Sequence, residues 1–280
     1  RPEAIERGRS FGHRKQFGER NSPSTYNAAL HVSQFWDGRA ADVEEQAKGP
    51  ILNPVEMTMA DEASVVAVLE SIPGYAPLFA AAFPDAKPAL SYDTMAQAIG
   101  AYERTLVTPS RFDAFLRGDK SALGPQELAG LQTFLDSGCF ACHQGAGIGG
   151  GMYQKLGLIK PYPTQDLGRG ALTHNDADAH VFKVPSLRNV AKTAPYFHDG
   201  SVATLPQAVR VMAEYQTASG PLPDAKVEQI VTFLQSLTGA LPTDKIAKPT
   251  LPPNGPKTPA ADPNFDPAAP PSTAKVPPKK

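Results

Sequence analysis

The stretch Cys139-Phe140-Ala141-Cys142-His143 holds the only two cysteines of the 280-residue chain. A Cys-x-x-Cys-His sequence is the signature of covalent c-type haem attachment, because each thiol bonds one vinyl group and the adjacent histidine binds the iron. Two other interpretations are a zinc knuckle and a thiol redox pair. Zinc usually needs a second ligand pair, which no further cysteine can supply. A thioredoxin-type pair belongs in a βαβ context, which the sequence lacks. The stretch therefore favours haem c and redox chemistry.

The chain carries balanced charge, with 27 Lys and Arg against 28 Asp and Glu. Such a balance leaves no excess of positive charge that would attract nucleic acid or an anionic membrane. No apolar run approaches the roughly 20 residues of a membrane-spanning helix, and no signal peptide is visible in the polar sequence after Arg1. Because haem is attached to this signature outside the cytoplasm in bacteria, we expect an exported, periplasmic protein whose signal has been removed.

Helical periodicity surrounds the haem signature on both sides. Asp61 is a plausible N-cap, and Pro73-Gly74 ends the apolar stripe that follows it. Residues 1–60 are expected to be irregular, and residues 144–203 to be rich in loops. The predicted helices cover 61–72, 91–106, 124–136, 205–215 and 224–237. The expected fold is therefore mainly α with long loops.

The C-terminal part differs in composition from the rest. From Leu241 onward, 12 of the last 40 residues are proline. Such a stretch cannot build a helical core and is typical of an extended or disordered strap.

Three further segments stand in order around the haem signature: Phe35-Trp36-Asp37-Gly38-Arg39-Ala40, Gly49-Pro50-Ile51-Leu52-Asn53-Pro54-Val55-Glu56-Met57 and Ala194-Pro195-Tyr196-Phe197-His198-Asp199-Gly200. With them the chain closely resembles the bacterial di-haem cytochrome c peroxidases, whose wider family includes the MauG-like enzymes. The resemblance runs from about residue 8 to about residue 250. It implies two cytochrome c-like domains, a peroxidatic one over 1–107 and an electron-transfer one over 108–240. It also implies that the first part of the 241–280 tail packs back on the first domain.

The resemblance assigns the high-potential haem to the C-terminal domain. Cys139 and Cys142 would attach it, His143 would be the proximal iron ligand, and Met212 the distal one. A thioether opposite histidine stabilises ferrous iron, which agrees with an electron-entry site. Without the resemblance, Met212 would be interpreted as a core residue of the 205–215 helix.

The N-terminal, peroxidatic haem would be covered by three residues that match the family. His13 would ligate its iron in the resting oxidised protein and leave on reduction of the other haem. Glu56 would move a proton between the two peroxide oxygens, and Gln46 would orient the peroxide. Taken alone, His13 would be a surface histidine, Glu56 a helix-start carboxylate and Gln46 part of a polar helix face.

The remaining assignments also come from the resemblance. Trp36 would connect the two haems electronically, and an ordinary core role is compatible with that. A calcium ion would lie between the domains on the Asn21 side chain and the carbonyls of Thr193 and Pro195, since oxygen ligands suit Ca²⁺.

A second Cys-x-x-Cys-His is absent from the sequence. We expect a chain truncated at its start, and a natural single-haem variant is the alternative. The leading hypothesis is a peroxidase that reduces hydrogen peroxide with electrons from a small cytochrome c or cupredoxin. The alternatives are a non-catalytic electron carrier and a MauG-like enzyme that oxidises another protein. In the MauG branch a tyrosine replaces the distal methionine, so Met212 favours the peroxidase. A homodimer is the family's usual state.

Overall fold

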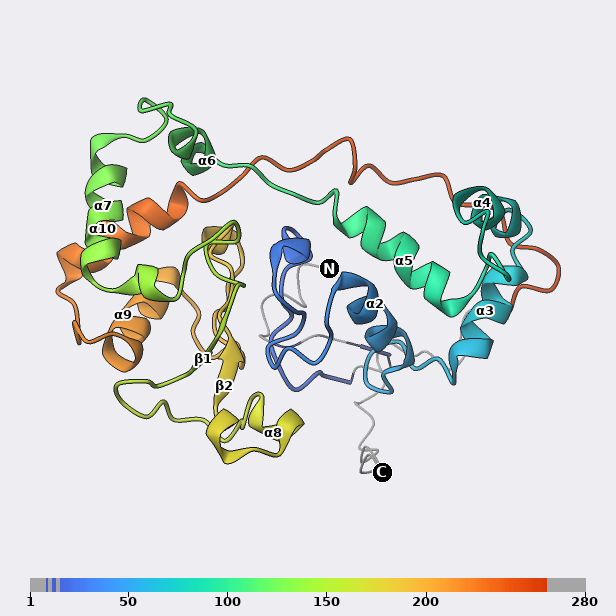
Figure 1. The fold of residues 1–280 in the computed structure, drawn as a ribbon, viewed down its shortest axis with the longest axis horizontal. Helices are drawn as coiled ribbons and strands as arrows, with labels where there is room; N and C mark the ends of the chain where they lie inside the picture. Colours follow the sequence, from blue (N-terminus) through green and yellow to red (C-terminus); the bar gives the residue numbers. More distant parts are fainter. Residues whose placement is uncertain (1–8, 10–11, 14–15, 261–280) are drawn as a thin grey trace.

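The computed structural model describes residues 9, 12–13 and 16–260. Two groups of helices lie at opposite ends of an elongated molecule, with irregular segments between them (Figure 1). The mainly α fold that the sequence predicts is confirmed, since the described residues form one small antiparallel sheet, in which β1 (Tyr153–Lys155) pairs with β2 (Val181–Lys183). The helices are α2 (Val43–Leu52), α3 (Glu62–Glu70), α4 (Tyr75–Ala82), α5 (Tyr92–Glu103), α6 (Arg111–Leu116), α7 (Pro125–Asp136), α8 (Gly170–Thr173), α9 (Leu205–Gln216) and α10 (Asp224–Gln235), with short 3-10 turns η2 (Ala28–Leu30), η3 (Cys139–Ala141), η4 (Asp176–Asp178) and η5 (Val190–Lys192).

Local capping explains where the predicted helices begin. Asp61 accepts a hydrogen bond from the Ser64 amide at the start of α3, and Ser91 forms a capping box with Thr94 at the start of α5. Each of the five predicted helices has its counterpart, in α3, α5, α7, α9 and α10. The largest deviation is at α5, which ends at Glu103 rather than at residue 106.

The expectation that residues 1–60 are irregular is wrong over α2. The Gly49-Pro50 pair suggests a turn, yet Pro50 lies in the last turn of this helix. There it removes a single intrahelical hydrogen bond, which limits its cost. The carbonyls of Pro50 and Ile51 accept hydrogen bonds from the Met57 and Met59 amides, so the loop that follows α2 folds back over its end.

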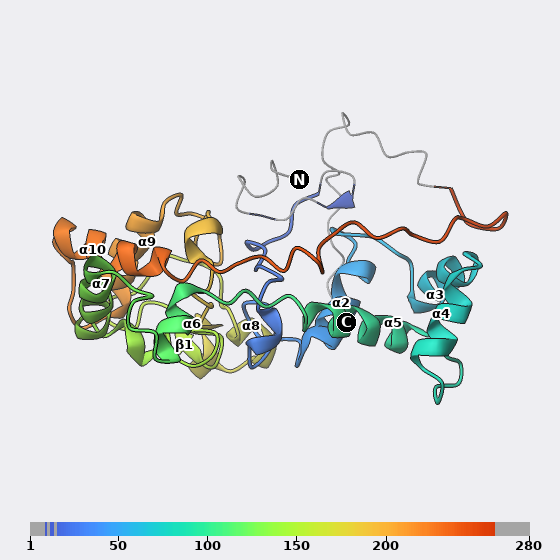
Figure 2. The same cartoon turned by 90° about the horizontal axis from the view of Figure 1, so that it is seen from above.

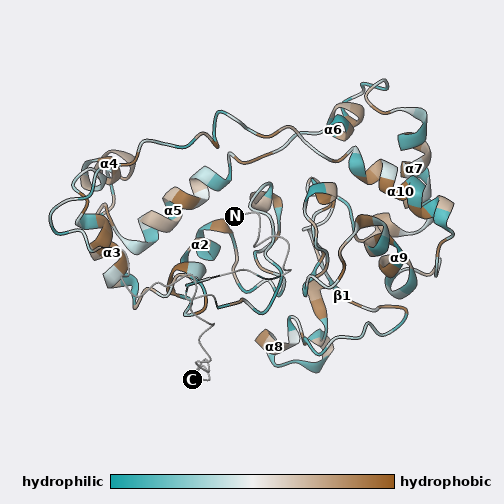
Figure 3. Cartoon of the chain, turned by 180° about the vertical axis from the view of Figure 1, so that it is seen from behind, coloured by the Kyte–Doolittle hydropathy of each residue, from teal (hydrophilic) through white to brown (hydrophobic). Residues whose placement is uncertain are grey.

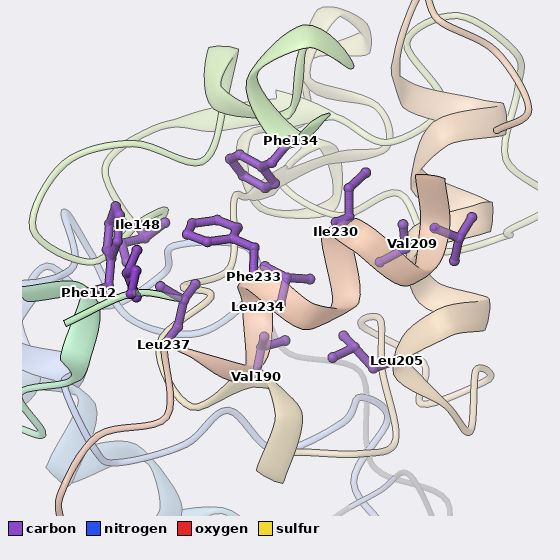
Figure 4. Packing of buried hydrophobic residues seen from close by; sticks show 12 residues of the cluster. Phe112, Phe134, Ile148, Val190, Leu205, Val209, Ile230, Phe233, Leu234 and Leu237 are labelled. Atoms are coloured by element: carbon purple, nitrogen blue, oxygen red, sulfur yellow. The ribbon is translucent and has the colours of Figure 1, made fainter. Parts of the chain in front are cut away.

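The C-terminal helices share one continuous apolar core (Figure 4). The ring of Phe233 lies 5.3 Å, centroid to centroid, from those of Phe112 and Phe134. Helices α7 and α10 approach so closely that a Cβ at Gly130 would lie 2.1 Å from the Gln229 carbonyl oxygen. The buried members are Phe112, Leu123, Phe134, Ile148, Val190, Leu205, Val209, Val227, Ile230, Phe233, Leu234 and Leu237.

The N-terminal helices form a smaller apolar cluster. Its buried members are Val65, Tyr92 and Met95, on α3 and α5. Figure 3 shows the apolar residues of α3 at the far end of the molecule from those of α10. The Tyr92 hydroxyl donates to the Lys48 carbonyl and so fastens α5 to α2.

The chain after α10 returns along the molecule to α3 and α4 (Figures 1 and 2). It has no helix or strand between residues 241 and 260. Lys245 accepts a hydrogen bond from Tyr102, and Thr258 donates to the Ser71 carbonyl. These contacts agree with a strap on the N-terminal helices. Residues 261–280 of the expected tail lie outside the described residues, and the domain limits at 107 and 240 stay predictions.

No single helix of the described residues is long and apolar enough to cross a membrane. Helices α3 and α4 reach the required length and hydropathy only when joined, and they are bent by 108°.

Candidate functional site

The haem signature forms one tight turn after α7. Gly138 takes a left-handed conformation that ends the helix, and the His143 amide donates to the Cys139 carbonyl. Both thiols are free. Burial raises the pKa of Cys139 to about 11, which reflects its position against the C-terminal core. Two unpaired thiols and a histidine therefore lie within a single turn.

His143 is fixed by its surroundings. Its Nδ1 atom is buried and has no hydrogen-bond partner among the described residues. The backbone of Gly149 lies against the ring, because a Cβ there would be 3.2 Å from Nδ1 and 2.2 Å from the Pro185 carbonyl oxygen. Burial lowers the pKa of His143 to about 4, so the imidazole is neutral at physiological pH. Neutral imidazole is the form that binds iron, so the residues at this turn fit a covalently attached haem.

Met212 lies in α9 and is half-buried. It is not a member of the C-terminal apolar core, whereas Val209 and Leu205 of the same helix are. The ordinary core role considered for Met212 stays open. Its assignment as distal ligand stays a prediction.

The segment that carries His13 packs on the turn that carries Glu56. The His13 amide donates to the Glu56 carbonyl at 2.6 Å, and the Gln16 side chain donates to the Pro54 carbonyl at 2.9 Å. A Cβ at Gly12 would lie 1.9 Å from the Val55 carbonyl oxygen, so the close approach requires glycine there.

Gln46 and Glu56 are held by one helix and the turn after it. Gln46 is half-buried on α2, and Glu56 follows the end of that helix. The Asn53 side chain donates to Glu56 Oε2 at 3.1 Å and accepts from the Val55 amide at 3.1 Å. Asn53 thus orients the carboxylate that the resemblance assigns to proton transfer, a contact that the sequence did not predict.

Trp36 lies where the N-terminal segment meets the sheet. Its indole Nε1 donates to the Asn21 carbonyl at 2.8 Å, and its own carbonyl accepts from the Lys183 amide of β2 at 2.8 Å. The centroids of the indole and of the His198 ring are 6.4 Å apart, and the two rings are arranged edge to face. Trp36 therefore contacts both halves of the molecule.

Two of the three expected calcium ligands meet directly. The Asn21 side chain donates to the Pro195 carbonyl at 2.7 Å and to the Phe197 carbonyl at 3.2 Å. Thr193 lies at the end of η5, two residues before Pro195. The Asn21 side chain is hydrogen-bonded to the Pro195 and Phe197 carbonyls and not to that of Thr193. Among the described residues there is no group of three or more His, Cys, Asp or Glu that could hold a metal ion. That finding does not concern a site built from a side-chain amide and backbone carbonyls, so the calcium site stays a prediction.

Several buried polar residues escaped the sequence analysis. His198 is 2% exposed, and its Nε2 lies 3.1 Å from the Thr164 hydroxyl. Its place in the Tyr196-Phe197-His198 motif was the available signal. Lys183 is 5% exposed, and its Nζ lies 3.4 Å from His31 Nδ1. Burial lowers the pKa of Lys183 to about 8 and that of His31 to about 4. No sequence pattern marked this pair.

The helical fold, the turn of two free thiols and the buried neutral histidine define a c-type haem protein. Its N-terminal half matches the family described as di-haem cytochrome c peroxidase over residues 3–121, and residues 128–238 match the cytochrome c family.

Individual proteins extend this match over most of the chain. The cytochrome c551 peroxidase of Pseudomonas aeruginosa is 49% identical over 89% of this chain and 73% of that protein. The cytochrome c551 peroxidase of Nitrosomonas europaea is 46% identical over 91% of this chain and 75% of that protein. The crystal structure of a MauG-like protein associated with microbial copper homeostasis superimposes with a TM-score of 0.72 at 28% identity, covering 84% of this chain and 79% of the other. The chain therefore belongs to the di-haem cytochrome c peroxidase family, a family of oxidoreductases.

Proposed function

We propose that this protein reduces hydrogen peroxide to water, with electrons from a small periplasmic redox protein. Each peroxide takes two electrons and two protons and gives two waters. The observation that carries the proposal is the hydrogen bond from the His13 amide to the Glu56 carbonyl. It brings the expected gating histidine to the turn of the expected proton-transfer carboxylate, directly after the helix that carries Gln46.

The N-terminal residues handle protons and access. Haem iron, when bound, supplies the electrons that reduce the O–O bond. Glu56, oriented by Asn53, accepts a proton from one peroxide oxygen and donates it to the other, which is general acid–base work. The Gln46 amide orients peroxide by hydrogen bonding. His13 would bind the iron in the resting oxidised state and so restrict access to this site.

The C-terminal residues take in electrons. Cys139 and Cys142 would hold the high-potential haem covalently, and His143 and Met212 would bind its iron. Trp36 then connects this region with the N-terminal one, which agrees with its hydrogen bonds to Asn21 and to β2. The donor is a small cytochrome c or a cupredoxin. The complete protein carries two haems.

The assembly follows the same proposal. A calcium ion at Asn21, Thr193 and Pro195 holds a peroxidatic domain (1–107) in register with an electron-transfer domain (108–240). The first part of the tail from residue 241 packs back on the peroxidatic domain, and the protein is a homodimer. Contacts of Asn21 with Pro195 and of Thr258 with Ser71 support the calcium and strap assignments, respectively.

The test is Glu56→Gln in the haem-loaded, complete protein. This substitution keeps the shape but removes the proton acceptor, so peroxide turnover should fall by about 10²–10⁴-fold, the usual range for a lost acid–base group. Glu45→Gln is the matched control, because Glu45 lies on α2 and its carboxylate pairs with Lys48 at the surface. Steady-state peroxide consumption measures both. Turnover of Glu56→Gln near that of the control would remove Glu56 from the mechanism.

A further inference from the structure

The stretch 16–21, which follows His13 in the chain, has its two ends fastened to different parts of the molecule. At one end, the His13 amide and the Gln16 side chain bond to the turn around Glu56. At the other end, the Asn21 amide donates to the His198 carbonyl at 2.7 Å. The segment therefore spans the distance between the expected peroxidatic site and the C-terminal region.

Arg20 lies in this stretch and forms ion pairs with two carboxylates. Its Nε and Nη2 atoms donate to the two carboxylate oxygens of Asp166, at 2.6 and 2.8 Å, in a bidentate pair. Its Nη1 donates to Asp37 Oδ2 at 2.7 Å. One guanidinium thus binds the carboxylates of Asp37 and Asp166, which lie 129 residues apart in the sequence (166 − 37).

The two carboxylates belong to the two regions between which electrons would pass in the proposed function. Asp37 follows Trp36 directly, in the N-terminal segment. Asp166 belongs to the C-terminal region, and its Oδ2 is 4.0 Å from Nε2 of the buried His198. The Asn21 carbonyl next to Arg20 accepts the Trp36 indole hydrogen bond. Arg20 therefore joins the gating segment, the tryptophan segment and the C-terminal region at one point.

The charges at this point are largely removed from water. The Arg20 side chain is 17% exposed, and those of Asp37 and Asp166 are 12% and 24% exposed. Burial alone would lower the pKa of Arg20, yet the hydrogen bonds to Asp166 and Asp37 outweigh it and raise that pKa. Removing one partner from such a group leaves unpaired charges at low exposure, which is strongly unfavourable. The planar fork is essential to the bidentate contact, and a lysine ammonium cannot reproduce it.

We propose that Arg20 is a positioning residue that latches the His13 segment across the two regions, so that His13 leaves the iron only when the Asp37–Arg20–Asp166 bridge opens. The inference rests on the proposed gating role of His13. A switch of this kind needs contacts that differ between its two states, and the bridge supplies contacts that stabilise the closed state. Weakening the bridge must then favour the open state without any reduction of the protein.

The test uses Arg20→Met in the complete, haem-loaded, fully oxidised protein. We expect the ratio of open to closed peroxidatic haem to rise at least about tenfold, as loss of a state-selective contact requires. Electron paramagnetic resonance and visible spectra measure this ratio as conversion of low-spin into high-spin ferric haem. Asp166→Asn removes the same contact from the other side and decides the matter if Arg20→Met fails to fold. Arg20→Lys should populate the closed state little more than Arg20→Met does, because lysine cannot form the bidentate contact.

Arg39→Met is the matched control. Arg39 also pairs with Asp37, at 3.1 Å, but its side chain is 41% exposed and its guanidinium lies over the Phe35 ring instead of bridging to Asp166. This variant should stay low-spin. Hydrogen exchange of residues 16–21 gives a second readout and should quicken in Arg20→Met and Asp166→Asn only. A high-spin change of equal size in Arg39→Met would overturn the latch.

His13→Gly separates this inference from the function on which it rests. If His13→Gly becomes high-spin while Arg20→Met and Asp166→Asn stay low-spin, the latch is refuted and the gating role stands. If His13→Gly itself stays low-spin, the gating role fails and the latch fails with it. The measurements are made both without calcium and in saturating calcium, and a spin change that calcium reverses would assign the effect to Asn21 and overturn the role of Arg20.

Discussion

The C-terminal helical group and the N-terminal one are stabilised by different means. In the first, α7, α9 and α10 enclose twelve buried apolar residues in a single core. In the second, the apolar cluster of the described residues has three buried members, and polar contacts do much of the fastening. Since apolar burial contributes about 25 cal/mol per Å², the larger core gives the C-terminal group the greater intrinsic stability. The N-terminal group depends more on its neighbours, which suits a region whose ligation is expected to change.

The largest expected difference comes from matched truncations in the two cores. Phe233→Ala should lower the free energy of unfolding by about 3–5 kcal/mol, because the ring is 1% exposed and contacts two other aromatic rings. Met95→Ala should cost about 2 kcal/mol, at the lower end of the usual range, since the small cluster can collapse into the space. Denaturant unfolding followed by circular dichroism compares them. Equal losses in the free energy of unfolding would contradict the expected difference between the two cores.

Ion pairs of the two groups give the next contrast. Arg188 and Asp113 pair at 2.7 Å with side chains 10% and 15% exposed, whereas Arg104 and Glu44 pair at 2.8 Å at the surface. Asp113→Asn should cost about 2–4 kcal/mol, because it leaves the Arg188 charge poorly solvated. Glu44→Gln should cost about 0–1 kcal/mol. Thermal unfolding at neutral pH measures both, and a large loss in Glu44→Gln would contradict the contrast.

The same pair predicts a pH dependence with a definite sign. The hydrogen bond from Arg188 holds the pKa of Asp113 well below its ordinary value of 3.8. A depressed folded-state pKa stabilises the protein above the unfolded value, and this contribution is lost as pH falls toward the folded value. The stability difference between wild type and Asp113→Asn should therefore be constant near neutrality and narrow below about pH 4. A gap that persists unchanged in acid would assign the effect of the substitution to packing.

The last expected effect lies where the two groups join. Thr108 is 1% exposed, and its hydroxyl accepts hydrogen bonds from the side chains of Asn27 and Asn189, each at 2.8 Å. Thr108→Val keeps the volume but removes the acceptor, at a cost of about 1–3 kcal/mol for buried amides left unpaired. Hydrogen exchange should show the loss mainly around Asn27, in the less stable group. Exchange that quickens first in α7 and α10 would reverse the comparison.

Local sequence predicted the helices because their signals lie within a few residues of each other. Asp61 caps α3 as expected, Ser91 caps α5 at the predicted start of that helix, and Gly124 precedes α7. The same locality caused the error at α2, where Gly49-Pro50 resembles a turn. The hydrogen bonds from Met57 and Met59 that complete the end of this helix come from a loop that local patterns do not describe.

The sequence by itself determined the haem attachment turn, the helical class and the family, because these depend on neighbouring residues and on long matched motifs. Only the tertiary structure placed Glu56 under the His13 segment, Asn21 against the Pro195 carbonyl and Arg20 between Asp37 and Asp166. Backbone carbonyls carry no side-chain signature, and a buried charge finds its partner from a distant segment only when folding removes both from water. The chemistry of the haem turn is therefore local, while the contacts of Glu56, Asn21 and Arg20 with distant segments are a property of the folded chain.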